Sequence, residues 1–85
     1  MTYRVDWTEA AENDLAGCWN ATSDRNAVTA AATWLEHHLK LDPLRFGEPW
    51  ASSVHRIAVH DPIGIEFEVI EDDKRVIVHG AFVVG

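Results

Sequence analysis

The sequence predicts an α+β fold in a single domain of residues 1–85, with a helical hairpin packed on one face of a mainly antiparallel sheet. Three observations predict it: a short alternating segment opens the chain, two stretches with helical spacing of apolar residues follow, and three strand-like segments close it. The element order is therefore β-α-α-β-β-β. Because 47% of the 85 residues are apolar, one domain can bury a core without a metal or a disulfide.

The first strand is expected at residues 3–7, where Tyr3, Val5 and Trp7 alternate with two charged residues. Thr8 follows as the expected N-cap of a helix that runs to about residue 20. This helix carries one apolar stripe, formed by Ala11, Leu15, Cys18 and Trp19. The stripe predicts that one side of the helix packs against the rest of the protein.

A second helix is expected from a cap at Ser23 or Asp24 to about residue 41. Its apolar face is wide, which is typical of a helix that packs on both a helix and a sheet. Two adjacent stripes form this face: Val28, Ala32, Leu35 and Leu39, and beside them Ala27, Ala31, Trp34 and His38. Pro43 ends the helix, because the residue before a proline is biased away from helical geometry. Three tryptophans are expected to face the core: Trp7, Trp19 and Trp34.

The last part of the chain is expected to form a loop and three strands. The loop covers residues 43–53, and its Phe46 and Trp50 are expected to anchor it to the core, with Trp50 also available to a partner. The strands are expected at 54–59, 63–70 and 75–84. One face of the middle strand is apolar: Ile63, Ile65, Phe67 and Val69. The last strand is almost wholly apolar, which predicts a central strand covered on both faces.

The chain is acidic, with 14 Asp and Glu against 7 Lys and Arg and a formal net charge of −7. Nucleic-acid binding depends on cationic side chains that neutralise phosphates, so direct binding of DNA or RNA is disfavoured and a basic protein partner is favoured. The sequence has no signal-peptide pattern and no apolar stretch near the ~20 residues that span a bilayer. Together with the single cysteine, these features predict a cytoplasmic protein with no membrane association.

Three stretches of the sequence resemble the RelE/ParE toxin superfamily of bacterial type II toxin–antitoxin systems, known also for plasmid stabilisation. They are "YRVDWTEAAENDL" at the start, "LKLDPLRFGEP" after the second expected helix, and "HRIAVHDPIGIEFEVIEDDKRVIVHGAF" at the end. Their order and spacing carry the resemblance, which covers essentially the whole chain. It implies a compact toxin that binds a small cognate antitoxin and, in some members, cleaves ribosome-bound mRNA or inhibits DNA gyrase.

The resemblance also implies where the chemistry of RNA cleavage would lie. RNA-cleaving members tend to carry a basic residue in or before the second strand, an arginine at the start of the third, and a histidine or tyrosine near the C-terminus. Arg56 matches the arginine of the second strand, but the third starts at Pro62-Ile63 and the chain ends in residues 82–85, "FVVG". The enzyme reading is therefore weakened, and a toxin-family component that binds a protein is predicted instead. Two alternatives stay open. One is a non-toxic, non-enzymatic binding or regulatory descendant of the same fold, and the other is a ribosome-dependent mRNA endonuclease.

Four residues are candidates for the functional site. Arg56 and His79 are the candidates for catalysis, as a phosphate-binding group and a proton donor. Arg56, Trp50 and Arg75 are the candidates for partner binding. The competing interpretation is that Arg56 pairs with Glu66 or Glu68 on the neighbouring strand, and that the histidine is a half-buried polar residue of the sheet.

No cofactor and no metal site is expected. His37 and His38 are adjacent, so on a helix their side chains point about 100° apart and do not chelate one ion together. His55 and His60 lack a recognised ligand spacing, and there is no cysteine pair. Cys18 is expected to be a small buried side chain. A homodimer and a complex with another protein both stay open, because the apolar last strand and a loop tryptophan could serve either.

Overall fold

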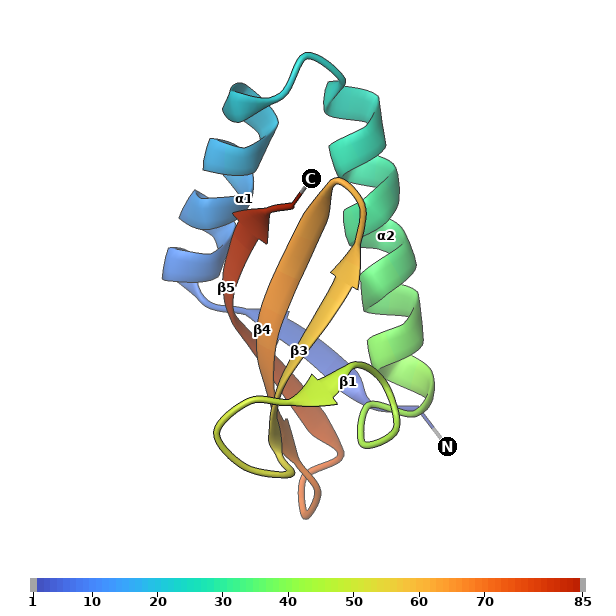
Figure 1. The fold of residues 1–85 in the computed structure, drawn as a ribbon. Coiled ribbons are helices and arrows are strands. Elements are labelled where there is room, and N and C mark those ends of the chain that lie inside the picture. The colour runs from blue at the N-terminus through green and yellow to red at the C-terminus, as the bar shows by residue number, and fades with distance from the viewer. Residues whose placement is uncertain (1, 85) are drawn as a thin grey trace.

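The computed structural model describes residues 2–84 of the chain (Figure 1). Its elements follow in the order β1 (Arg4–Trp7), α1 (Glu9–Ala21), α2 (Arg25–Leu41), β2 (Glu48–Pro49), β3 (His55–His60), β4 (Ile63–Ile70) and β5 (Arg75–Val83). The five strands form one open sheet in the order β1-β5-β4-β3-β2. The pair β1–β5 is parallel and the other three pairs are antiparallel. The predicted α+β class, with two helices packed against a mainly antiparallel sheet, is confirmed, and the two-residue strand β2 is an addition.

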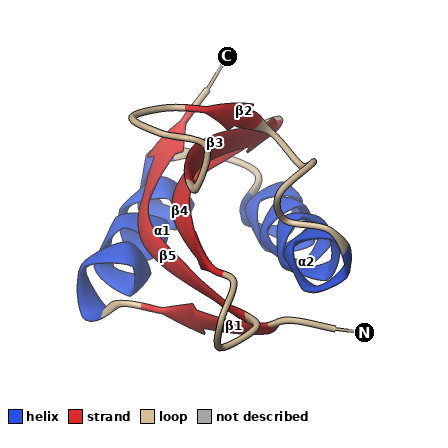
Figure 2. Cartoon of the chain, turned by 90° about the horizontal axis from the view of Figure 1, so that it is seen from below, coloured by secondary structure: helices blue, strands red, loops and turns tan. Residues whose placement is uncertain are grey.

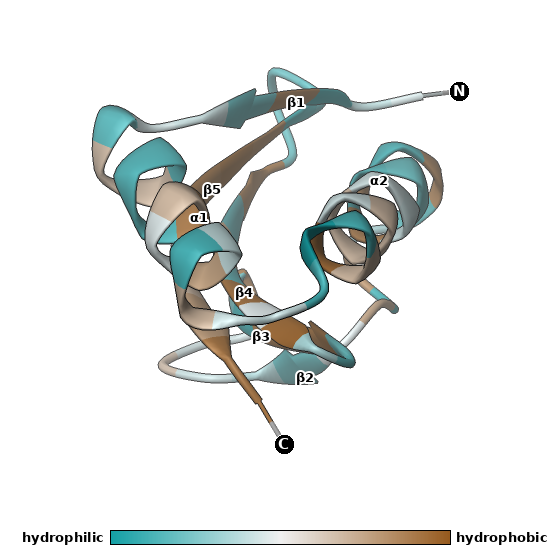
Figure 3. Cartoon of the chain, turned by 90° about the horizontal axis from the view of Figure 1, so that it is seen from above, coloured by the Kyte–Doolittle hydropathy of each residue, from teal (hydrophilic) through white to brown (hydrophobic). Residues whose placement is uncertain are grey.

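Helix α2 packs in the hollow of the strongly twisted sheet, which curves around it from β1 to β3 (Figure 2). Leu35 and Leu39 of α2 are fully buried, as are Ile65 and Phe67 of β4. The apolar face predicted for residues 63–70 is therefore the face that α2 covers. In Figure 3 the hydrophobic colour gathers on β4 and β5, and it continues along the end of β5 toward the C-terminus. The sheet face turned away from α2 is called the outer face below.

Helix α1 continues along the edge of β5 where β1 stops. The register of β1 ends at Trp7 opposite Val78, and the Thr8 amide donates to the Val78 carbonyl at 3.1 Å. Beyond that point the edge of β5 faces α1, and the carboxylate of Asp14 accepts a hydrogen bond from the Ala81 amide at 3.3 Å. Both helices begin at the predicted caps, since Thr8 Oγ1 accepts from the Ala11 amide and Asp24 Oδ1 accepts from the Ala27 amide. Helix α1 thus covers the part of the β5 edge that β1 leaves open to pairing.

Two expectations about burial are wrong. Trp19 and Trp34 were expected to face the core but are 42% and 40% exposed. Trp34 lies at the surface because its ring stacks on His60, with centroids 4.2 Å apart, while shorter side chains of α2 reach the sheet. Strand β5 is central, but it is not covered on both faces, because Phe82 and Val83 are exposed at its end. Gly85, the last residue of the expected C-terminal segment, lies outside the described residues.

Candidate functional site

The candidate site is the outer face of the sheet, where β3, β4 and β5 present one polar and one apolar region. The pairing register places these side chains in neighbouring rows: His55 beside Glu68, Ile57 beside Glu66, and Val59 beside Gly64, with Phe82 of β5 beside Gly64. Glu66 and Val59 are exposed. A sheet face that carries both hydrogen-bonding and apolar groups can serve as a binding surface.

The polar region is a cluster of two histidines and one glutamate. His79 Nε2 lies 2.9 Å from Glu68 Oε1, and His55 Nε2 lies 3.7 Å from the same oxygen. Ser52 Oγ lies 3.2 Å from His55 Nδ1. A β-bulge between Glu66 and Phe67 offsets the pairing of β4 and β5, so that Glu66 faces Gly80 and Phe67 faces Val78. His79 is the extra residue, and the bulge turns its ring toward Glu68.

This cluster brings one of the two catalytic candidates, His79, next to Glu68, which the sequence suggested only as a pairing partner of Arg56. The two imidazoles and the carboxylate can accept and donate protons or hold a polar group of a partner. Cleavage of RNA also needs a positive group near the scissile phosphate. In the described part of the chain, neither Arg56 nor Arg75 contacts this cluster, because each is held elsewhere. The geometry supports hydrogen bonding more than phosphate chemistry.

The apolar region is a row formed by Val59, Phe82 and the backbone of Gly64. The distal end of the Phe82 ring lies over Gly64, since a Cβ atom there would come within 2.5 Å of two ring carbons. Val59 is 55% exposed and Phe82 is 37% exposed. Contiguous exposed apolar groups of this kind are typical of surfaces that bind another molecule.

Trp50 extends this apolar region toward the sheet edge. Its side chain is 66% exposed, so the expectation that it anchors the loop to the core is wrong, whereas Phe46 does pack against the core. A cavity of about 420 Å³ lies beside Trp50, lined by Gly47, Glu48, Pro49, Trp50, Ile57, Ala58 and Val59. The cavity joins Trp50 to Val59 of the apolar row. The role of Trp50 in partner binding stays a prediction, and its exposure favours it.

Arg56 is buried and holds the loop that carries Trp50. It is 7% exposed, and its guanidinium donates to three backbone carbonyls, those of Phe46 at 3.0 Å, Gly47 at 3.1 Å and Ser53 at 3.1 Å. The predicted pairing with Glu66 or Glu68 is wrong, because Arg56 is paired with Phe67 in the register and points to the inner face. Its burial and its three carbonyl partners argue against direct contact with a substrate or a partner.

Gly47 is a residue of this region that sequence reasoning missed. Its φ of 71° lies in the left-handed region, which glycine adopts without steric cost. A Cβ atom at this position would clash with the Ile57 carbonyl oxygen and lie 3.0 Å from Ala58 Cβ. The signal was present in the sequence, since Gly47 is the only glycine of the loop at residues 43–53. Gly47 and Arg56 together set the position of Trp50 against β3.

Arg75 lies at the other end of the sheet, away from the apolar row. Its Nε lies 2.8 Å from Asp6 Oδ2, and Arg4 Nε lies 3.1 Å from the same oxygen. The hydrogen bond from Arg75 is the main reason why the pKa of Asp6 is below its ordinary value, and Arg4 adds to it. The structure therefore gives Arg75 a partner within the chain, and its role in binding another protein stays a prediction.

Replacing Asp6 by asparagine is expected to change how stability depends on pH. The pKa of Asp6 is lower in the folded chain, so this carboxylate stabilises the fold above the unfolded-state pKa of about 3.9 and stops doing so as the pH falls through the folded-state value. Urea unfolding should show wild type to be the more stable of the two near pH 6, with the difference shrinking below about pH 4. If the stability difference between wild type and Asp6→Asn stayed constant down to pH 2, the ionised carboxylate of Asp6 would not be its cause.

Metal binding finds no support in residues 2–84, which contain no group of three or more His, Cys, Asp or Glu side chains able to hold an ion. His37 and His38 lie on α2 with ring centroids 5.6 Å apart and nearly perpendicular planes.

Cys18 is buried, 4% exposed, as expected, and burial raises the pKa of its thiol. Within residues 2–84, neither helix is long and apolar enough to cross a bilayer.

Comparison with known proteins gives structural matches only. No protein-family model matches the sequence, and no curated protein matches it significantly. A chain from the crystal structure of the toxin–antitoxin complex RelBE2 from Mycobacterium tuberculosis has a TM-score of 0.80 at 17% identity, covering 99% of this chain and 93% of that chain. A chain from the chromosomal ParDE TA system of P. aeruginosa has a TM-score of 0.74 at 16% identity, covering 98% and 97%. The chain therefore shares the fold of these chains, in agreement with the resemblance to the RelE/ParE superfamily.

Proposed function

We propose that this chain is the toxin-family component of a type II toxin–antitoxin module and that it acts by binding a protein rather than by cleaving RNA. The fold shared with chains of the RelBE2 and ParDE structures supports the first part. The observation that carries the second part is the outer face, where an exposed apolar row lies beside a histidine–glutamate cluster with no arginine or lysine in contact with it among residues 2–84.

The positions implied for RNA cleavage support the same reading. Strand β4 begins at Ile63, directly after Pro62, and β5 ends at Val83, so neither place supplies an arginine or a proton donor. The remaining candidate, His79, is held by Glu68 at 2.9 Å, and Arg56 is turned to the inner face. An mRNA endonuclease that used this cluster would need a phosphate-binding group from outside it.

The partner that we propose is a cognate antitoxin with an apolar anchor and basic flanks. The apolar anchor would cover Val59 and Phe82, and the basic flanks would suit a chain with a net charge of −7. DNA gyrase and the ribosome are the proposed cellular targets, of which a gyrase-like protein target suits this surface better. A cytoplasmic location and a homodimer in the absence of the antitoxin belong to the same proposal.

Replacing Val59 by lysine is expected to weaken antitoxin binding at least about tenfold, because a charge would enter the middle of the apolar row. Leu41→Lys is the matched control, since Leu41 is 52% exposed at the end of α2, away from the outer face. The measurement is a pull-down from the native host with the tagged chain, followed by titration of the captured antitoxin. Capture that is equal for both variants would place the binding surface elsewhere.

A further inference from the structure

Strand β1 borders the sheet on the side opposite β2, and the side of β1 that faces away from β5 is called the β1 edge below. Figure 2 and Figure 3 show neither helix beyond this edge. Within residues 2–84, β1 pairs with β5 and with no other strand. An open strand edge presents unpaired amides and carbonyls, so another strand can pair with it.

The hydrogen bonds of β1 show which backbone groups point to the β1 edge. The amides of Arg4 and Thr8 donate to carbonyls on the β5 side, at 2.9 Å and 3.1 Å. Because backbone groups alternate in direction along a strand, the amides and carbonyls of Val5 and Trp7 point the other way, to the β1 edge. No described residue forms a backbone hydrogen bond with them there.

The end of α2 limits how much of the β1 edge a second strand can reach. The Tyr3 amide also points away from β5, but it donates to the Lys40 carbonyl at 2.8 Å. The last turn of α2 therefore covers the edge at Tyr3. The backbone available to a second strand is that of Val5 and Trp7.

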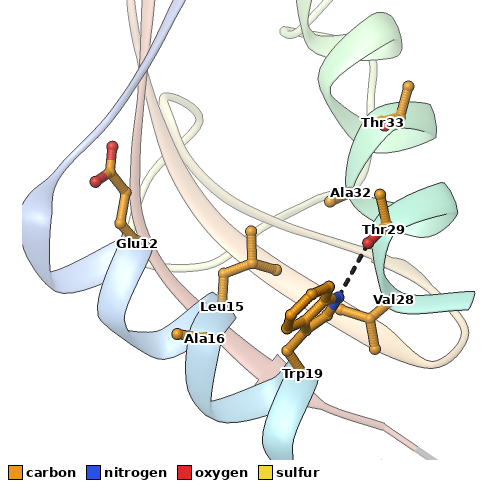
Figure 4. A pocket seen from close by; sticks show the side chains of 8 residues that line it. All are labelled: Glu12, Leu15, Ala16, Trp19, Val28, Thr29, Ala32 and Thr33. Carbon is orange, nitrogen blue, oxygen red and sulfur yellow. Dashed lines mark hydrogen bonds between the residues drawn. The ribbon is translucent and has the colours of Figure 1, made fainter. Parts of the chain in front are cut away.

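Side-chain hydrogen bonds hold α2 on the inner face, beside the β1 edge and not over it. Trp7 Nε1 donates to Glu36 Oε1 of α2 at 3.0 Å. Toward its other end, α2 is tied to α1, because Trp19 Nε1 donates to Thr29 Oγ1 at 3.0 Å (Figure 4). The helix pair is thus fixed at both ends, and the β1 edge stays accessible at Val5 and Trp7.

Charges of both signs are balanced around the β1 edge, although the whole chain has a net charge of −7. Asp6 and the hairpin residues 71–73 supply four carboxylates, and an equal number of cations lies beside them. These cations are Arg4, Lys40, Lys74 and Arg75. Two copies of an acidic chain repel each other over most of their surface, but at this edge they can approach without net repulsion.

We propose that the β1 edge pairs with the β1 edge of a second copy of the chain, antiparallel and about a two-fold axis at Asp6. Val5 then lies opposite Trp7 of the partner subunit, and this pair exchanges both N–H···O bonds. On the outer face, Arg4 lies diagonal to Asp6 of the partner subunit, which is a favourable pairing of opposite charges. An axis at Val5 is disfavoured, because it would use the part of the edge that α2 covers at Tyr3.

This inference deepens the proposed function by naming the surface that joins two copies, and it rests on that function only for the homodimer. The test is sedimentation equilibrium of the isolated chain from about 1 µM to about 1 mM, over which the mass should rise from that of a monomer toward that of a dimer. Val5→Pro removes an amide at the β1 edge and leaves the amides that bind β5 in place. It should weaken the dimer at least about tenfold.

Val5→Thr is the matched control, because threonine keeps the amide and a β-branched side chain, and it should dimerise about as well as wild type. In wild type, amide hydrogen exchange should slow at Val5 and Trp7 as the concentration rises, whereas the Arg4 amide, which binds β5 in either state, should not change. This measurement locates the interface without a substitution. Thermal unfolding of both variants checks that they are folded.

Three results would overturn the proposal: a chain that stays monomeric at about 1 mM, exchange at Val5 and Trp7 that does not depend on concentration, or a Val5→Pro variant that dimerises like Val5→Thr. A dimer lost in Val59→Lys but kept in Val5→Pro would place the interface on the outer face instead. None of these measurements needs toxicity or an antitoxin. Their failure therefore removes the β1 pairing alone, while the antitoxin pull-down tests the proposed function separately.

Discussion

Replacing Arg56 by methionine is expected to lower the free energy of unfolding by about 3 kcal/mol, measured by urea denaturation near pH 7. Arg56 is 7% exposed, and the replacement leaves three carbonyls without the donors that now reach them. Methionine keeps much of the apolar stem, so the loss reports the guanidinium rather than a cavity. For a chain of 85 residues, this is a large share of a total stability of about 5 kcal/mol.

Arg56→Lys distinguishes the effect of the positive charge on stability from that of the planar guanidinium. Lysine keeps the positive charge but is a single point donor, whereas the planar guanidinium reaches carbonyls on both sides of the loop. We therefore expect lysine to recover less than half of the loss. A methionine variant as stable as wild type, or a lysine variant that restores full stability, would mean that Arg56 does not hold the loop in the way described.

Replacing Gly47 by alanine is expected to lower the free energy of unfolding by a similar amount, about 3 kcal/mol. The new Cβ would clash with the Ile57 backbone, and alanine is strained at the positive φ of this position. The obstacle is backbone of the paired strand β3, so no side chain can turn away to make room. The loop or the β2–β3 pairing must shift instead. The measurement is again urea denaturation, with tryptophan fluorescence reporting whether the surroundings of Trp50 change.

Gly17→Ala is the matched control for this replacement. Gly17 lies inside α1, where a Cβ atom would meet nothing within 4 Å. Alanine there should stabilise the chain by about 0.5–1 kcal/mol, since glycine is unfavourable inside a helix. If Gly47→Ala were as stable as Gly17→Ala, Gly47 would not be held in the left-handed conformation described above.

The regular elements were predictable because their signals are local. Alternation and helical spacing placed both helices and the strands at 63–70 and 75–84 within a few residues of where they lie. The same periodicity gives the direction of a side chain but not what covers it. Trp19 and Trp34 lie on the helix faces expected, but both stay at the surface: Trp19 donates to Thr29 of α2, and Trp34 stacks on His60.

The candidate site was predicted in part. His79 and Trp50 do lie on one side of the sheet with exposed side chains, and the sequence singled out both. Arg56 was misplaced because the segment at 54–59 does not alternate clearly, so its inner and outer faces could not be told apart. Its true partners are carbonyls of a loop, which have no sequence signature. The contact between His79 and Glu68 depends on the β-bulge and so on the pairing register of β4 and β5. The sequence of a single strand does not show this register.

The most direct test of the account is induced expression of the chain alone in a bacterial host, with growth recorded and the 5′ ends of cellular mRNA mapped before and after induction. We expect growth arrest without new mRNA ends at codon positions, because the outer face is proposed to bind a protein and its histidine–glutamate cluster has no arginine or lysine in contact with it among residues 2–84. New ends at regular codon positions would contradict it and establish an mRNA endonuclease. Normal growth at high soluble yield would also contradict it and favour a non-toxic binding descendant of the fold.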